Sequence, residues 1–215
     1  MIAESGHPWP LLGVIWGVLI VMQLVEFLAA RKRREGWRQL AESRGCTYTR
    51  EDPSLISLDP KIFGSRGLKK FFDVISGQHA GIAVKRFLLF KSSGRYSITM
   101  PVVSADLSTS MPRMIVTREF GPLHGRHPDL QRFEGGEGPF RQTFDVWTSN
   151  PAFAAATLAP PTTDWMLSLK GVYGFEVSGD HALAYGGSGR PRDIDKLIEA
   201  CIGFVQRLPS PTAEW

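Results

Sequence analysis

The stretch LLGVIWGVLIVMQLVEFLAA, residues 11–30, decides how this chain is organised. Only Gln23 and Glu26 in it are strongly polar, and a helix of this length spans about 30 Å, the thickness of the hydrocarbon core of a bilayer. Pro10 suits the start of a helix, and Trp9 suits the interface between membrane and water. The stretch therefore predicts one transmembrane helix.

The apolar stretch is followed directly by four basic residues that we expect to determine its topology, Arg31, Lys32, Arg33 and Arg34. A cleaved signal peptide carries its positive charges before the apolar run and ends in a small-residue cleavage site. Here the preceding segment holds Glu4 and no lysine or arginine, and 28–30 matches a cleavage site poorly. We expect an uncleaved anchor with its N-terminus outside and its basic end in the cytoplasm.

Two glycines on the apolar stretch suggest that the helix associates with a second copy. Gly13 and Gly17 form a G-x-x-x-G pattern, which allows two transmembrane backbones to approach closely. Gln23 flanks the same face and could donate a hydrogen bond across a dimer. The alternative is that two glycines fall at this spacing by chance. A homodimer through the membrane helix is thus one possible assembly, and the lipid bilayer is the expected partner in either case.

Overall composition excludes several classes of protein. The net charge of +4 equals the charge of the basic cluster after the apolar stretch, so no basic face is left to indicate a nucleic-acid partner. Cys46 and Cys201 stand at opposite ends of the remaining chain and do not resemble the cysteine framework of a secreted domain. A reducing compartment fits this usage better than an oxidising one.

The pattern of hydrophobic residues predicts five parts: an extracytoplasmic N-terminus (1–10), the transmembrane helix (11–30), a basic juxtamembrane helix (31–45), a soluble domain (46–208) and a tail (209–215). Trp37, Leu40 and Ala41 recur at helical spacing, and Gly45 is a natural helix end. We expect this juxtamembrane helix to continue the anchor and to pack on the domain.

The soluble domain has the pattern of an α+β fold, with a mainly antiparallel sheet of six to eight strands and helices toward its C-terminal end. We expect strands, two pairs of them hairpins, over 46–50, 71–76, 81–90, 96–107, 113–117, 140–148, 174–177 and 181–185. We expect helices over 153–158, 164–169 and 194–208, the last of them strongly amphipathic, with Cys201 on its apolar face. The segments 71–84 and 175–185 share several residues, which suggests either a duplicated hairpin or ordinary turn chemistry.

The densest group of polar side chains lies in the glycine-rich segment 121–138. His124 and His127, with nearby carboxylates at Asp129, Glu134 and Glu137, have the side-chain types that hold zinc or another divalent ion. The alternative is a solvated surface loop, which collects the same residue types. No nucleophile motif or phosphate-binding glycine motif is present in the sequence, so catalytic residues stay unknown and we expect no cofactor.

The layout resembles a group of uncharacterised bacterial single-pass membrane proteins with a cytoplasmic domain of unknown function. The likeness rests on the anchor, on a W-x-x-L-A-x-x-R-G element from Trp37 to Gly45, on an F-x-V-I-S-G hairpin and on a closing amphipathic helix that ends in Leu208-Pro209. It implies location in the bacterial inner membrane. We expect a membrane-anchored, non-enzymatic binding or scaffold protein with an unidentified protein partner. The alternative is a metal-dependent hydrolase that uses the loop 124–137.

Overall fold

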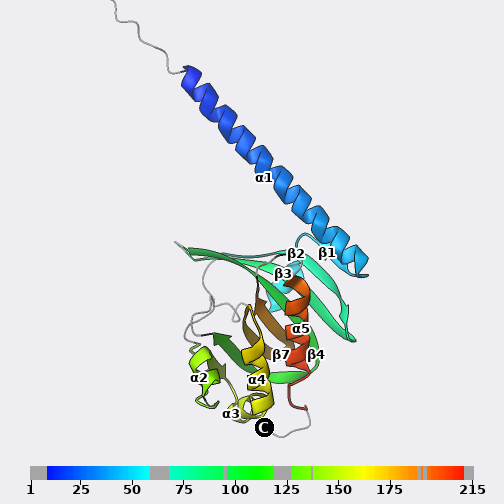
Figure 1. Ribbon diagram of the computed structural model, residues 1–215, viewed down its shortest axis with the longest axis vertical. Coiled ribbons are helices and arrows are strands. Elements are labelled where there is room, and N and C mark those ends of the chain that lie inside the picture. The colour runs from blue at the N-terminus through cyan, green and yellow to red at the C-terminus, as the bar shows by residue number, and fades with distance from the viewer. Residues whose placement is uncertain are drawn as a thin grey trace, which may run out of the picture.

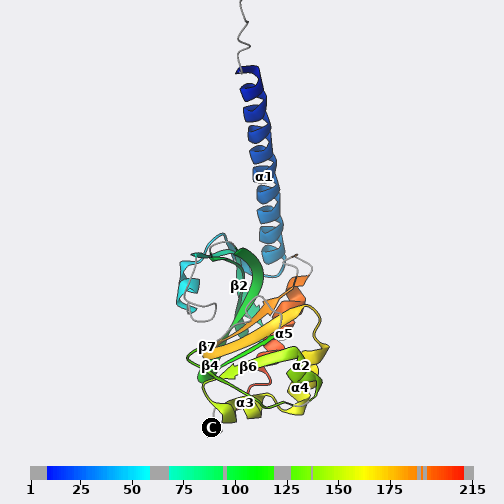
Figure 2. The same ribbon diagram turned by 90° about the vertical axis from the view of Figure 1, so that its left-hand side faces the viewer.

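The described residues form one long helix followed by a domain of strands and shorter helices. The computed structural model describes residues 9–58, 68–93, 96–118, 127–136, 138–187, 190 and 193–210. Helix α1 (Trp9–Ser43) is one continuous element of 35 residues, which projects away from the domain and meets it only at its C-terminal turns (Figure 1; Figure 2). The side chains of α1 are described from Trp16 onward.

Helix α1 ends in a glycine-terminated cap, as the sequence predicts. Gly45 has a φ of 65°, and its N–H donates to the carbonyl of Glu42, while the N–H of Cys46 donates to the carbonyl of Ala41. This pair of bonds satisfies carbonyls at the helix end and turns the chain sharply. The first strand therefore starts directly beside the helix.

The described strands form one seven-stranded, wholly antiparallel sheet in which β4 is central. The path runs β1-β2-β3-β4-β6-β5, and β7 pairs with β4 along both of its halves. The strands are β1 (Thr47–Thr49), β2 (Leu68–His79), β3 (Ile82–Ser93), β4 (Tyr96–Arg118), β5 (Gln131–Arg132), β6 (Phe144–Thr148) and β7 (Val172–Gly186). The predicted α+β class with a mainly antiparallel sheet is confirmed.

Two predicted strand pairs are each a single long strand. The interval between the predicted strands 96–107 and 113–117 falls inside β4, and the interval between the predicted strands 174–177 and 181–185 falls inside β7. At this point the pairing shifts. Asp106 pairs with His181 and Met111 with Gly179, so β4 has more residues than β7 between the two pairs. Gly179 has a φ of 59° beside this bulge. The turn residues thus bend two continuous strands, and the duplicated-hairpin hypothesis loses its second hairpin.

The first predicted hairpin is present, with its turn two residues later than expected. Strands β2 and β3 pair from Leu68 to His79, and Ala80 and Gly81 form the connection with φ values of 52° and 79°. Two consecutive positive φ values are the geometry of a two-residue turn whose twist matches that of the strands.

Both faces of the sheet are covered where β3, β4 and β7 meet. One face packs against α3 (Pro151–Thr157), α4 (Pro160–Ser168) and α5 (Ile194–Val205), and it holds the largest cluster of buried apolar side chains, including Phe175, Cys201 and Phe204. The other face is covered by the 3-10 helix η1 (Pro53–Leu58). On this face Phe87 of β3 and Tyr185 of β7 are buried in a second cluster with Leu55 of η1. Alternate residues of the same strands serve the two faces, since successive strand side chains point in opposite directions.

The three C-terminal helices predicted from the sequence are present, although α4 begins at Pro160, four residues before the predicted start. Asn150 caps α3 by accepting a hydrogen bond from the N–H of Phe153 at 3.1 Å, and a proline opens both α3 and α4. The segment predicted as one strand over 140–148 is wrong in its first half, where Pro139–Thr143 forms the short helix α2. A proline at the first helical position favours this start over a strand.

Candidate functional site

The junction between α1 and the domain is the most distinctive polar region of the described chain. Trp37 and Ala41, one helical turn apart on α1, are buried against Ile75 of β2 and Ile194 of α5. The predicted juxtamembrane face therefore packs on the domain. Helix α1 continues without interruption from Trp16 to this contact. The projecting part of the helix is therefore joined to the domain by continuous helical backbone.

A buried arginine lies under the indole of Trp37. The side chain of Arg86 is 1% exposed, and its guanidinium carbon stands 4.0 Å from the centre of the Trp37 ring. Its Nη1 donates to the backbone carbonyl of Asp73 at 3.2 Å. Burial lowers the pKa of Arg86 to about 10, while the charges of Asp73 and Tyr48 act in the opposite direction. The guanidinium is therefore still charged at neutral pH, and the indole supplies part of its stabilisation.

Asp73 connects this arginine to the first strand. The hydroxyl of Tyr48 donates to Asp73 Oδ1 at 2.8 Å, and burial together with this hydrogen bond raises the pKa of Tyr48 to about 12. Asp73 is itself buried, and it has a φ of 54° at an irregular step in the β2–β3 pairing. Positive φ is unfavourable for a residue other than glycine, so the surrounding contacts hold this carboxylate in place.

Several polar atoms in this cluster have no hydrogen-bond partner among the described residues. They are Trp37 Nε1, Asp73 Oδ2, Arg86 Nε and Arg86 Nη2. Buried polar atoms are usually bonded, and leaving one unsatisfied costs about 1–3 kcal/mol. These atoms are thus the polar groups of the junction that the described residues satisfy least well.

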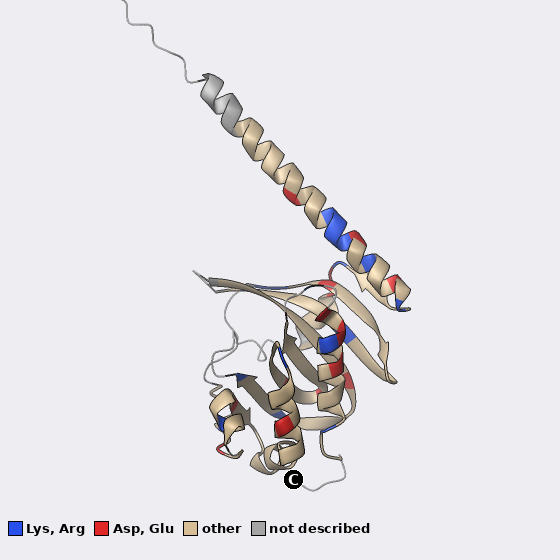
Figure 3. Cartoon of the chain, in the orientation of Figure 1, with Lys and Arg blue, Asp and Glu red and all other residues tan. Residues whose placement is uncertain are grey.

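A pocket of about 500 Å³ opens beside the cluster. Its walls come from three places: the turns of α1 that follow the apolar stretch, the segment that leads into η1, and the start of β2. Basic side chains dominate the lining, namely Arg33, Arg34, Arg50, Lys69 and Lys70. Figure 3 shows basic residues gathered in the part of α1 that approaches the domain.

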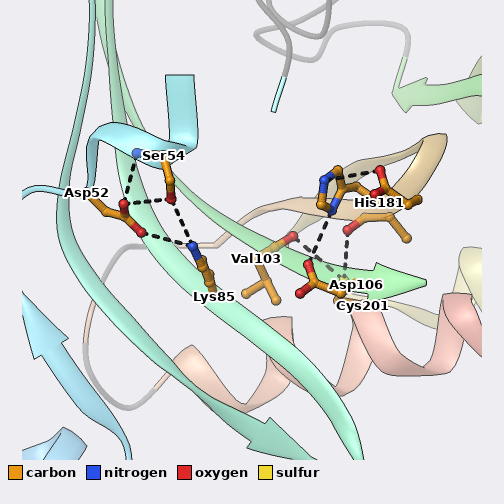
Figure 4. Close-up of polar contacts among 9 residues, drawn as sticks. Asp52, Ser54, Lys85, Val103, Asp106, His181 and Cys201 are labelled. Carbon is orange, nitrogen blue, oxygen red and sulfur yellow. Dashed lines mark hydrogen bonds and ion pairs between the residues drawn. The ribbon is translucent and has the colours of Figure 1, made fainter. Parts of the chain in front are cut away.

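An acidic residue of the pocket is already held by neighbouring side chains. Asp52 accepts from the Ser54 hydroxyl at 2.7 Å and from Lys85 Nζ at 3.0 Å (Figure 4). These bonds, that of Ser54 first, lower the pKa of Asp52 against the opposing effect of burial. Asp52 therefore stays ionised, and its charge is balanced by Lys85.

The predicted metal site is not assembled by the described residues. His124 and Glu137 lie outside them, and His127 packs edge-on against Trp147 with ring centres 5.7 Å apart. Glu134 forms ion pairs with Arg141 and Arg132. Within the part of the chain that the structure describes, no three histidine, cysteine or acidic side chains come together as metal ligands would. Because His124 is not described, the His124–His127 site stays a prediction.

The cysteines carry no sign of nucleophilic chemistry. Both are free, Cys46 half-buried and Cys201 buried. Cys201 Sγ lies 3.7 Å from the carbonyl oxygen of Val103, and burial raises its pKa to about 12 (Figure 4). A thiol with a raised pKa is a poor nucleophile. Cys201 is also fully buried, so the prediction that it is a core residue is confirmed.

His181 on β7 lies between Asp106 and Asp180, 3.2 Å from each.

The residues predicted for dimerisation in the membrane, Gly13 and Gly17, stay a prediction. Gly17 faces open space on α1, and Gly13 lies where side chains are not described. Within the described side chains, which begin at Trp16, no helix combines the length and the hydropathy needed to cross a bilayer. The start of the predicted span, 11–15, lies outside that part.

The sequence analysis did not single out Tyr48, Asp73 and Arg86 of the junction cluster, or the part of the pocket outside α1. One signal was available for Arg86, because it interrupts the apolar run 81–90 between Val84 and Phe87, and arginine is rarely buried unless it is paired. Lys69 and Lys70 precede an apolar strand, which is common at strand ends and gives no indication of a pocket. The bulge that turns Asp73 inward has no signal in its own sequence.

A comparison with solved structures gives a likeness of fold. No known protein family matches the chain, and no curated protein matches it. Among solved structures, the chain is similar to the crystal structure of the mycobacterial trehalose monomycolate transport factor A, TtfA, with a TM-score of 0.64 and 17% identity. The match covers 85% of this chain and 97% of that one. At this level of identity the likeness concerns the fold alone.

Proposed function

We propose that this chain is a membrane-tethered, non-enzymatic accessory protein of transport at the bacterial inner membrane. Its domain acts at the cytoplasmic face as a binding or scaffold module. The observation that supports membrane tethering is the exposed apolar surface of α1. Trp16 is 64% exposed and Ile20 61%, and the apolar residues around them are exposed as well. An apolar surface of this extent is unfavourable in water, so it needs a cover.

A bilayer is the cover that fits the sequence around this surface. The exposed apolar residues belong to the stretch 11–30, which is long enough to span the hydrocarbon core, and four basic residues follow it. A basic cluster at one end of an apolar helix favours the cytoplasmic side of the membrane. This arrangement supports a domain in the cytoplasm.

Two further points support an accessory role rather than catalysis. The fold is like that of the mycobacterial trehalose monomycolate transport factor A, TtfA. In the described residues, the buried polar groups at the junction hold the helix and the domain together, as Arg86 and Trp37 do. The buried polar side chains of the junction thus fix the position of the domain relative to α1.

Fractionation of bacteria that express the full chain with a C-terminal reporter tests the tether and its orientation. We expect the protein to stay in the membrane pellet after an alkaline carbonate wash, and a chain without 11–30 to become soluble. A reporter active only in the cytoplasm should be active, and a periplasmic phosphatase fusion should be silent. Full-length protein in the soluble fraction would overturn the tether, and an active phosphatase would overturn the orientation.

Affinity purification of the full-length protein from its own membrane tests the accessory role. We expect a membrane transport protein to co-purify in amounts comparable to the tagged chain. The matched control is the chain without 11–30, which should lose that partner. Purification of the full chain without any enriched membrane protein would contradict the scaffold assignment.

A further inference from the structure

We propose that the pocket between α1 and β2 binds the phosphate head group of an anionic membrane lipid. The inference deepens the proposed function and rests on its tether, since the pocket takes lipid only if the apolar stretch of α1 lies in a bilayer. The pocket has a volume of about 500 Å³ and is lined by residues from α1, from the segment before η1, from η1 itself and from β2. Ligand sites in proteins commonly have volumes of 300–1,000 Å³.

The charge of the lining favours an anion. Five of the lining residues are basic, whereas Glu51, Asp52 and Asp73 are acidic. Asp52 is held by Lys85 and Ser54, and Asp73 accepts from Tyr48 next to the buried Arg86. Positive charge is therefore in excess at the cavity. Lysine and arginine are the side chains that bind phosphate oxygens in proteins.

The position of the pocket on α1 points to a lipid as the source of that anion. Ala30, Arg33 and Arg34 line it, and they follow the exposed apolar residue Leu28 by two to six positions. At 1.5 Å per residue this is a distance of about 3–9 Å along the helix axis. When the apolar stretch lies in the hydrocarbon core, the pocket therefore lies at the level of the head groups. Basic side chains at this level attract anionic lipids.

Apolar side chains in the same pocket suit the part of a lipid next to its phosphate. Ile56 is 66% exposed, and Phe72 of β2 also lines the cavity. An exposed isoleucine beside a group of cations has no role in binding a free phosphate ion. It offers contact to a glycerol backbone or to the first methylene groups of an acyl chain. The lining thus fits an amphiphile with a phosphate group.

The test measures lipid binding to full-length protein in an uncharged detergent, by native mass spectrometry with dioleoyl phosphatidylglycerol as the probe. We expect Lys69→Gln with Lys70→Gln to weaken binding roughly 30-fold, because each basic residue at the head-group level contributes about fivefold. Lys70→Gln alone should weaken it about fivefold and serves if the double variant does not fold. The matched control is Lys170→Gln with Lys196→Gln, two lysines outside this pocket, which should bind as the wild type does.

Three results would overturn the pocket. They are phosphatidylcholine binding as tightly as phosphatidylglycerol, glycerol phosphate without acyl chains binding as tightly as the lipid, and the Lys69 and Lys70 variants binding like the control. The second of these would assign the site to a soluble phosphate compound. Fractionation is independent of these measurements. A protein that stays in the membrane pellet while the variants bind normally refutes the pocket and leaves the tether intact.

Discussion

Trp16 and Trp37 are the same residue type on the same helix, yet they lie in opposite environments. The side chain of Trp16 is 64% exposed, whereas that of Trp37 is 1% exposed and covers a buried guanidinium. The difference shows that α1 has two apolar surfaces in different environments. The C-terminal surface is covered by the domain, and the other is exposed, with a bilayer as the cover that we propose for it. Loss of either tryptophan should therefore affect a different property of the protein.

The largest effect is expected at the buried tryptophan. Trp37→Ala removes a fully buried ring and leaves Arg86 without its stacked partner, so we expect a loss of about 3–5 kcal/mol in the free energy of unfolding. For a chain of this size that corresponds to a fall in melting temperature of roughly 10 °C, measured in detergent by circular dichroism. Trp16→Ala is the matched control and should melt within about 2 °C of the wild type. Equal melting of both variants would refute the comparison.

A smaller effect should appear in the reactivity of Cys46, which lies at the junction and is half-buried. In Trp37→Ala the docked turns of α1 should open more often, so we expect a thiol reagent at pH 8 to label Cys46 about tenfold faster. Cys201 is buried in the domain core and should react only on unfolding. A Cys201→Ala background isolates the Cys46 signal. An unchanged rate in Trp37→Ala would mean that the tryptophan does not hold the helix.

The next prediction concerns pH. The pKa of Tyr48 is raised to about 12, because burial and Asp73 both favour the protonated phenol. The tyrosines of the unfolded chain ionise near pH 10, so this residue makes the free energy of unfolding fall as the pH rises from about 10 to about 12. We expect Tyr48→Phe to remove that alkaline loss and to remove an ionisation step near pH 12 in an absorbance titration. A Tyr48 step near pH 10 in the folded protein would be inconsistent with the buried Tyr48–Asp73 pair.

The smallest effect is expected at the surface of the junction. Arg44 and Asp195 form an ion pair at 2.7 Å between the end of α1 and the start of α5, and both side chains are partly exposed. Exposed pairs contribute about 0.2–1 kcal/mol. Arg44→Ala should therefore lower the melting temperature by no more than about 3 °C, and high salt should remove the difference from the wild type. A loss as large as that in Trp37→Ala would place the main contact of the junction at its rim.

Local sequence signals predicted the elements whose cause is local. The continuous α1, its end at Gly45, the Asn150 cap and the apolar face of α5 all depend on residues a few positions apart. The two long strands could not be predicted in this way, because Pro112 in β4 and Gly179 in β7 are typical of turns when each is considered alone. Their pairing across the sheet converts both into bends. The junction cluster and the pocket depend on contacts between distant segments, so only Trp37 and the basic residues of α1 were predictable.

One consequence follows from the continuity of α1, and it concerns angular phase. An α-helix turns by about 100° per residue, so Gly17 and Trp37, twenty positions apart, differ by about 200° around the axis. The glycine face and the domain-docking face thus look in nearly opposite directions. A second helix that packs on Gly17 would leave the docking face unobstructed, and each domain would hang on the outer side of the pair. A single residue inserted between 30 and 36 would rotate one face against the other by about 100°, and an insertion of seven residues would restore their alignment to within about 20°.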